Sequence, residues 1–177
     1  MSEISDRVHR ELMSKYVEYC EKYNLGELHV EIEKPYNHYG QRGFIDIFSV
    51  NRNAGSYNVC EVKPSLENLG EAIRQLKKVE SALESGMTLD YDIAGLRGFY
   101  RLVTLFNEHN YSIISDSYVL LKNVKIPLGI SLFCEKNNYW FGPLWPNYFK
   151  PESISEHWDQ LDWRWERCQK GLTEHKQ

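Results

Sequence analysis

The sequence predicts an α/β fold in which a central mixed sheet of four to five strands is flanked by helices. The chain opens with an amphipathic helical pattern, continues with three strand-like segments, and then alternates between helical and strand periodicity. Its 177 residues are 42% apolar, which is enough for one core of ordinary size. We therefore expect residues 1–177 to form a single domain.

Hydrophobic spacing defines the first helix and the first strand. Residues 5–23 carry apolar side chains at helical intervals, and Gly26 is a helix stop shortly beyond them. Residues 27–34 alternate apolar and polar side chains, and Pro35 follows. This alternation is typical of a half-exposed strand, which we expect to end at Pro35.

The second half of the chain repeats both periodicities. Helical spacing covers 65–85 and 113–121, whereas short apolar runs that read as strands cover 101–106 and 130–133. Residues 139–146 have the composition of a loop. The chain is then expected to end in a helix with an aromatic stripe.

Apolar side chains of that last helix recur every three to four residues, at Trp158, Leu161, Trp165, Cys168 and Leu172. We expect this stripe to pack on the sheet or on the first helix, because an aromatic stripe at helical spacing is more often core than ligand site. A symmetric dimer seam and a platform for unpaired bases are the alternatives.

Two acids and a lysine fall on a predicted β-hairpin. Asp46 lies in one strand, residues 51–56 have the composition of a turn, and Glu61 and Lys63 lie in the returning strand. Because side chains alternate along a strand, Glu61 and Lys63 share a face, and the antiparallel return brings Asp46 close to Glu61.

This grouping predicts a divalent-metal site for phosphodiester cleavage. Phe44 and Phe48 share the face of Asp46 by the period of two, so an unpaired carboxylate there would be costly. Two neighbouring carboxylates also raise each other's pKa unless a cation lies between them, and their hard oxygen ligands suit Mg²⁺ or Mn²⁺. Lys63 would then position a water or stabilise charge on the phosphate. Without Asp46, Glu61 and Lys63 would be an ordinary surface pair.

The ordered motif resembles that of the PD-(D/E)xK nucleases, in particular their RecB-like and archaeal Holliday-junction-resolvase-like branches, over roughly residues 5–80. The resemblance rests on Asp46, then Glu61-Val62-Lys63, then a helix that carries Gln75. It implies a restriction-endonuclease-like core and a Mg²⁺- or Mn²⁺-dependent deoxyribonuclease. Asp46 and Glu61 would be the metal ligands, with the Val62 carbonyl as a further one, and Lys63 and Gln75 would complete the catalytic set.

Two positions in the sequence help to distinguish which branch of the family the chain resembles. A tyrosine four residues after the glutamine completes the fuller pattern, but Val79 stands there. The first helix would also supply a metal ligand, a glutamate in the resolvase branch and a histidine in the RecB-like branch. Here Glu11 and His9 both qualify, and because they are two residues apart they cannot both face one point. Glu11 is narrowly preferred.

Overall charge and cysteine usage limit the remaining functions. The net charge of -4 requires any DNA-binding surface to be a local basic patch. The four cysteines are scattered singly, so neither a zinc site nor a disulfide framework is expected. No apolar run is long enough for a membrane span, and the polar start of the chain favours a cytoplasmic protein. DNA, without a membrane, is the expected partner. A nucleic-acid-binding or scaffold protein with little or no catalysis is the alternative, and an unrelated α/β protein is the third possibility.

Overall fold

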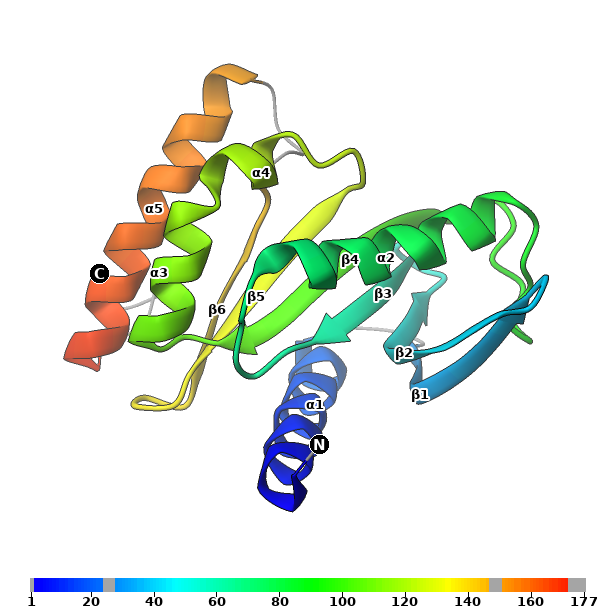
Figure 1. Cartoon of the computed structure of the whole chain (residues 1–177), viewed down its shortest axis with the longest axis horizontal. Helices are drawn as coiled ribbons and strands as arrows, with labels where there is room; N and C mark the ends of the chain where they lie inside the picture. Colours follow the sequence, from blue (N-terminus) through cyan, green and yellow to red (C-terminus); the bar gives the residue numbers. More distant parts are fainter. Residues whose placement is uncertain (1, 24–27, 147–150, 172–177) are drawn as a thin grey trace.

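A six-stranded mixed sheet forms the centre of the molecule in the computed structural model (Figure 1). The structure describes residues 2–23, 28–146 and 151–171, excluding the side chains of 118 and 151–160. In chain order the elements are α1 (Glu3–Tyr23), β1 (Leu28–His38), β2 (Gln41–Asn51), β3 (Ser56–Val62), α2 (Leu69–Glu84), β4 (Arg97–Leu105), α3 (Glu108–Asp116), α4 (Tyr118–Lys122), β5 (Leu128–Cys134), β6 (Tyr139–Leu144) and α5 (Pro151–Lys170).

The strands lie in the sheet in their chain order, from β1 to β6. Antiparallel pairing joins β1 to β2, β2 to β3 and β5 to β6, whereas β3, β4 and β5 are parallel. Parallel neighbours require a crossover connection, and α2 and the α3–α4 pair supply the two crossovers. The predicted α/β class is therefore confirmed, with six strands in place of the expected four to five.

Two apolar layers cover the two faces of the sheet. Val59, Leu102 and Ile130 belong to a large cluster that includes the buried faces of α2, α3 and α5. Cys60 and Val103 belong to a smaller cluster under α1. Residues that are adjacent in a strand thus enter different clusters, as strand alternation requires. α1 covers one face of the sheet and the other helices cover the opposite face.

Both edge strands contain a proline, which sequence reasoning had treated as a strand breaker. β1 continues through Pro35 to His38, and Pro143 lies within β6, which was expected to be a loop. A proline has no N–H to donate, but an edge strand pairs on one side only and can accommodate it. The missing strand in the prediction was therefore β6, because local composition does not reveal an edge position.

Helix starts are set by capping residues. Asn68 accepts a 3.1 Å hydrogen bond from the Glu71 N–H, so α2 begins at Leu69 and not at residue 65. Asn107 caps α3 in the same way through the Asn110 N–H, at 2.8 Å. In place of the single helix predicted over 113–121, the structure has two helices, α3 and α4. The first of them begins before residue 113.

Cys134 and Cys168 form a disulfide, although the scattered cysteines had predicted no disulfide framework. Cys134 ends β5 and Cys168 lies on α5, 34 residues later, so only the packing of α5 on the sheet brings them together. No local spacing of cysteines in the sequence predicts such a pair. Cytosolic proteins seldom keep disulfides, and the cytoplasmic location stays a prediction.

The aromatic stripe of α5 packs within the chain where it is described. Leu161 is buried, and the half-buried Trp165 stacks on Tyr111 of α3 with 4.9 Å between ring centroids. Trp158 and Leu172 lie outside the residues whose side chains are described. Intramolecular packing therefore accounts for Leu161 and Trp165, and the homodimer stays a prediction.

Candidate functional site

Asp46 and Glu61 lie on neighbouring antiparallel strands and line one cavity of about 780 Å³. The cavity lies between the first half of α1, the middle of β2, the end of β3 and the segment that leads into α2. Asp46 Oδ2 accepts a 2.8 Å hydrogen bond from the Val62 N–H. The side chains of Asp46 and Glu61 are only 17% and 10% exposed. The hairpin therefore brings the two predicted acids together, largely shielded from solvent.

Lys63 lies directly beside Glu61, as alternation along the strand predicts. Its Nζ is 3.3 Å from Glu61 Oε1, and its side chain is 36% exposed. The Lys63 N–H donates to the Val103 carbonyl at 2.9 Å, which extends the pairing of β3 with β4 past the end of the strand. The ammonium is thus held at the cavity while it remains reachable from solvent.

The alternation of β2 is interrupted at Asp46. Ile45 and Phe48 both enter the cluster under α2, whereas Ile47 enters the cluster under α1. Phe44 is 68% exposed. The expectation that Phe44 and Phe48 form one apolar face with Asp46 is therefore wrong, because the strand changes face at that carboxylate. Its hydrogen bond to the backbone replaces the apolar surroundings that were expected.

Burial and neighbouring charges shift the pKa values of two residues at the cavity. Burial, reinforced by the charge of Asp46, raises the pKa of Glu61 to about 7, although Lys63 acts in the opposite direction. The hydrogen bond to Asp46 raises the pKa of His9 against the effect of burial. The pKa of Glu61 is thus raised mainly by removal of its carboxylate from water, and the pKa of His9 mainly by the neighbouring Asp46 carboxylate.

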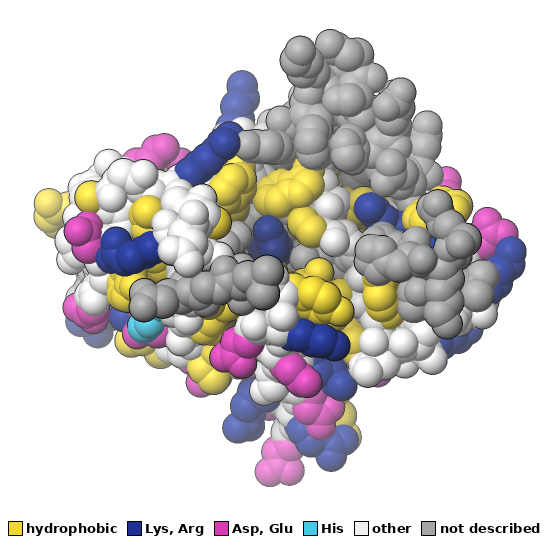
Figure 2. Space-filling view, turned by 180° about the vertical axis from the view of Figure 1, so that it is seen from behind, with side chains coloured by type: hydrophobic (Ala, Val, Ile, Leu, Met, Phe, Trp, Pro, Cys, Tyr) yellow, Lys and Arg dark blue, Asp and Glu magenta, His cyan; other side chains and the backbone are white. Residues whose placement is uncertain are grey.

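The first helix contributes His9 to the cavity. His9 Nε2 lies 3.4 Å from Asp46 Oδ2, and its side chain is 19% exposed. Glu11 is 62% exposed and lies 3.6 Å from Arg7, outside this cavity. Acidic and basic side chains are interspersed where α1 projects from the molecule at the bottom of Figure 2. The preference for Glu11 over His9 is thus not supported by the geometry, which brings only His9 to Asp46.

Gln75 approaches Glu61 from another side. Its Nε2 donates to Glu71 Oε1 at 3.2 Å, and Glu71 also binds Arg74 through two hydrogen bonds. Gln75 lines a smaller cavity of about 210 Å³ that shares Glu61 with the larger one and also contains Arg42. The structure therefore places Gln75 near Glu61 and does not bring it into the cavity of Asp46.

A buried asparagine that sequence reasoning missed fixes the segment after Lys63. Asn110 is fully buried at the start of α3, and its Oδ1 accepts a 2.9 Å hydrogen bond from the Leu66 N–H. Its Nδ2 donates to the carbonyls of Pro64 and Leu105, each at 2.8 Å. These bonds tie the segment that lines the cavity to the end of β4.

Thr104 completes this support. Its Oγ1 donates to the Lys63 carbonyl and lies 3.1 Å from the Nδ2 of Asn110. The only signal in the sequence for the role of Asn110 is its position one helical turn before Ile114, on the face of α3 that is buried in the structure. Such a residue is a candidate for a structural hydrogen-bond centre, because buried amides are nearly always satisfied.

The oxygen atoms at the cavity fit Mg²⁺ or Mn²⁺. Among the described residues no three His, Cys, Asp or Glu side chains are grouped so that they could hold a metal ion. An ion at this cavity would therefore use the carboxylates of Asp46 and Glu61, the Val62 carbonyl and water. Mg²⁺ is commonly held in this manner, by one or two carboxylates, several waters and substrate phosphates.

Comparison of the chain with protein-family models, curated proteins and solved structures yields no match. No helix in the described part of the chain combines the length and apolar character needed to cross a membrane. Family and function thus have to be argued from the residues and their geometry.

Glu61→Gln should stabilise the metal-free protein at alkaline pH. Because the pKa of Glu61 is raised from 4.5 to about 7 on folding, the folded protein holds a proton that the unfolded chain releases between these values. Its stability therefore falls as pH rises through this window. At about pH 8 the free energy of unfolding of the variant should exceed that of wild type by on the order of 2 kcal/mol. At about pH 4 the variant should show no such gain in stability, because Glu61 is protonated in both states of the wild type.

Urea denaturation in EDTA at both pH values measures this difference. Glu11→Gln replaces an exposed carboxylate of α1 and is the matched control, which should leave the pH dependence of wild type unchanged. A Glu61→Gln protein that is less stable than wild type at about pH 8 would show that the ionised Glu61 carboxylate does not destabilise the folded protein.

Proposed function

We propose that this protein is a metal-dependent deoxyribonuclease that hydrolyses phosphodiester bonds. The observation that carries the proposal is the convergence of Asp46, Glu61 and Lys63 in one cavity, with both carboxylates largely shielded. A shielded acid pair with an adjacent ammonium is costly to keep without a function. Together with the ordered motif, it favours metal-assisted chemistry at a phosphate.

The order of the elements supports a restriction-endonuclease-like core. A helix, three antiparallel strands, a second helix and a strand parallel to the third follow one another from α1 to β4. The resemblance to the PD-(D/E)xK nucleases implies the same order. The helical segment of α3 and α4 and the parallel strand β5 continue this order, and β6 and α5 would then be additions to the core.

Each residue of the cavity has a role that follows from its chemistry. Asp46 and Glu61, with the Val62 carbonyl, would hold the ion. A bound Mg²⁺ or Mn²⁺ would neutralise charge on the phosphate and lower the pKa of a coordinated water. The Lys63 ammonium cannot ligate a cation, so it is assigned to the attacking water or the phosphate oxygens. His9 would orient Asp46 through their contact.

The DNA backbone would approach along α2. Arg42, Arg74 and Lys78 line the smaller cavity that adjoins Glu61, where Gln75 also lies. Arg74 is engaged by Glu71, and the Lys78 ammonium lies 3.4 Å from the Arg42 carbonyl. This local group of cations would offset the net charge of -4 where a phosphate backbone has to bind.

A nucleic-acid-binding or scaffold protein with little or no catalysis is the second candidate. It is favoured by the arrangement of the side-chain metal donors, since no three His, Cys, Asp or Glu side chains within the described residues are grouped so that they could hold a metal ion. Cleavage and binding assays on the same protein separate the two candidates.

The decisive experiment compares wild type with an Asp46→Ala/Glu61→Ala double variant. Wild type should bind Mn²⁺ in calorimetry and cleave branched, single-stranded or duplex DNA only when Mg²⁺ or Mn²⁺ is present. The double variant should lose both properties, because it lacks both carboxylate ligands. Glu21→Ala removes an exposed acid of α1 and should keep both.

Equal Mn²⁺ binding by wild type and the double variant would place the metal elsewhere. DNA binding by wild type without cleavage of any substrate would favour the second candidate. Equal cleavage by both proteins would indicate a contaminating nuclease and would contradict the proposal.

A further inference from the structure

The first turn of α2 brings a further carboxylate to the cavity of Asp46. Glu71 lines that cavity together with Asp46 and Glu61, and its side chain is 49% exposed. Hydrogen bonds from Arg74 and Gln75 lower the pKa of Glu71 to about 2, and the charge of Lys63 acts in the same direction. Glu71 is therefore ionised at neutral pH, and it can turn more easily than the two shielded acids.

Two side chains of the same helix hold this carboxylate. Arg74 donates to Glu71 from Nε at 3.0 Å and from Nη2 at 2.7 Å, and Gln75 Nε2 donates to it at 3.2 Å. The Arg7–Glu11 pair of α1, by contrast, has a single contact of 3.6 Å. Three donors thus converge on Glu71, and they direct its oxygen atoms toward α2.

The Glu71–Arg74 pair lies at the border between the two cavities that share Glu61. Glu71 lines the larger cavity with the acids, whereas Arg74 and Gln75 line the smaller cavity with Lys78. The carboxylate is therefore on the side of the candidate metal site, and the guanidinium is on the side where the phosphate backbone would bind. A phosphate at Arg74 would compete directly with Glu71.

An exchange of partners at Arg74 is energetically easy. Exposed ion pairs contribute little to stability, and a guanidinium binds a phosphate through two parallel hydrogen bonds as it binds a carboxylate. The released Glu71 would gain the cation at Asp46 and Glu61 as its new partner, since Mg²⁺ and Mn²⁺ prefer oxygen ligands. DNA and the ion would then strengthen each other's binding.

We propose that Glu71 is a metal ligand that the DNA substrate releases. Arg74 and Gln75 hold Glu71 in the free protein, and a DNA phosphate that binds Arg74 frees it for the ion. This exchange, called the Glu71 switch below, rests on the proposed nuclease function for the identity of the DNA and the ion. It also assigns Gln75 the role of holding Glu71, although Gln75 does not line the cavity of Asp46.

Fluorescence anisotropy in EDTA tests the release of Arg74 without metal or cleavage. The full-length protein is titrated into a labelled forked DNA. Glu71→Ala should bind it about 3- to 5-fold more tightly than wild type, because the Arg74 guanidinium is no longer engaged. In an Arg74→Ala background the same substitution should change the affinity by less than about 2-fold, which separates the switch from a general effect of charge. The cap of α2 is retained, since Asn68 binds the Glu71 N–H.

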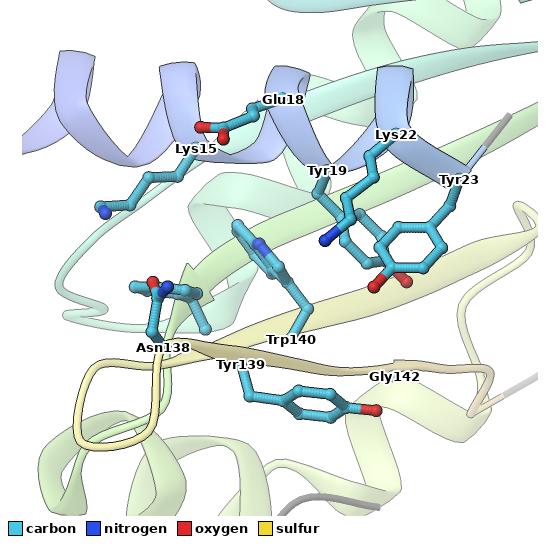
Figure 3. A pocket seen from close by; sticks show the side chains of 10 residues that line it. Lys15, Glu18, Tyr19, Lys22, Tyr23, Asn138, Tyr139, Trp140 and Gly142 are labelled. Atoms are coloured by element: carbon cyan, nitrogen blue, oxygen red, sulfur yellow. The ribbon is translucent and has the colours of Figure 1, made fainter. Parts of the chain in front are cut away.

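Glu11→Ala and Glu18→Ala are the matched controls. Glu11→Ala releases Arg7 from an exposed pair. Glu18→Ala removes an exposed carboxylate from the cavity of about 580 Å³ between α1 and the β5–β6 hairpin (Figure 3). Among the described residues that cavity shares no lining residue with the two cavities that contain Glu61. Both controls should bind DNA as wild type does.

The release of Glu71 to the ion predicts that Mn²⁺ strengthens DNA binding through this carboxylate. Anisotropy is measured in EDTA and in Mn²⁺ at about pH 8.5 for Lys63→Ala, which keeps the DNA intact, and for Lys63→Ala/Glu71→Ala. Mn²⁺ should raise the affinity of Lys63→Ala for DNA about 5-fold or more, and that of the double variant by a smaller factor.

Several results would overturn the Glu71 switch even if the protein cleaves DNA. They are wild-type affinity of Glu71→Ala in EDTA, an equal gain in a control or in the Arg74→Ala background, and an equal effect of Mn²⁺ with and without Glu71. Failure of wild type and Glu71→Ala to bind DNA would overturn it as well. A protein that shows the gain in affinity and the Mn²⁺ effect but cleaves no substrate would retain the switch and remove the nuclease.

Discussion

Lys63→Ala should abolish metal-dependent DNA cleavage while the fold and the affinity for Mn²⁺ are retained. Lys63 Nζ lies 3.3 Å from Glu61 Oε1 at a cavity that both acids line. An ammonium has only donors, so it serves the water or the phosphate and not the metal. By analogy with the loss of one oxyanion donor, the rate should fall about 100-fold or more, which is roughly 3 kcal/mol of barrier.

Metal affinity has to be compared above the pKa of Glu61. Lys63 lowers the pKa of Glu61, so its removal raises that pKa further and makes a proton compete with the metal at neutral pH. Calorimetry at about pH 8.5 largely avoids this competition. Lys63→Arg should not restore the rate, since a planar guanidinium cannot replace a compact ammonium.

Lys125→Ala removes an exposed lysine remote in sequence from the motif and serves as the matched control. It should cleave at the rate of wild type. A Lys63→Ala protein that cleaves branched, single-stranded and duplex DNA as fast as the control would remove Lys63 from the chemistry.

Strand alternation predicted the part of the site that lies on β3. Glu61 and Lys63 share a face and Cys60 and Val62 point to the other, because β3 is an interior strand with a helical layer on each side. Alternation is reliable under such conditions, since each face is buried against different partners.

Strand alternation failed on β2, because the irregularity that disturbs it lies on the neighbouring strand β1. Glu33 of β1 has a φ of 49°, and the pairing of β1 with β2 passes from Ile32 opposite Ile47 to Lys34 opposite Ile45. Asp46 lies across from this position. A positive φ at a glutamate is uncommon and has no sequence signature, so the change of face at Asp46 could not be predicted.

The choice between His9 and Glu11 could have been made from the sequence. Leu12, Met13 and Tyr16 are the buried residues of α1. They follow His9 by three, four and seven positions, which places His9 on the same face and turns Glu11 away. The resemblance to the family left both residues open, whereas helical geometry favours one of them. The disulfide and the position of Asn110 depend instead on contacts across the whole fold.

Asn110→Ala should destabilise the protein and slow cleavage, although Asn110 does not line the cavity of Asp46. The amide of Asn110 binds the Leu66 N–H and the carbonyls of Pro64 and Leu105, with no exposure to water. Each buried group left without a partner costs about 1–3 kcal/mol, so the free energy of unfolding should fall by about 3–5 kcal/mol. The released segment begins at Lys63, whose ammonium should then be less well positioned.

Asn123→Ala is the matched control for this positioning role. The amide of Asn123 is exposed and donates to the Val119 carbonyl at 2.7 Å, so its loss should cost less than about 1 kcal/mol. Urea denaturation gives the stabilities, and cleavage is compared at a temperature where both variants are folded. The Asn110 variant should then show a lower kcat with an unchanged Mn²⁺ affinity, because the carboxylates lie on β2 and β3. Full activity in folded Asn110→Ala would mean that the Asn110 amide supports the fold without positioning Lys63.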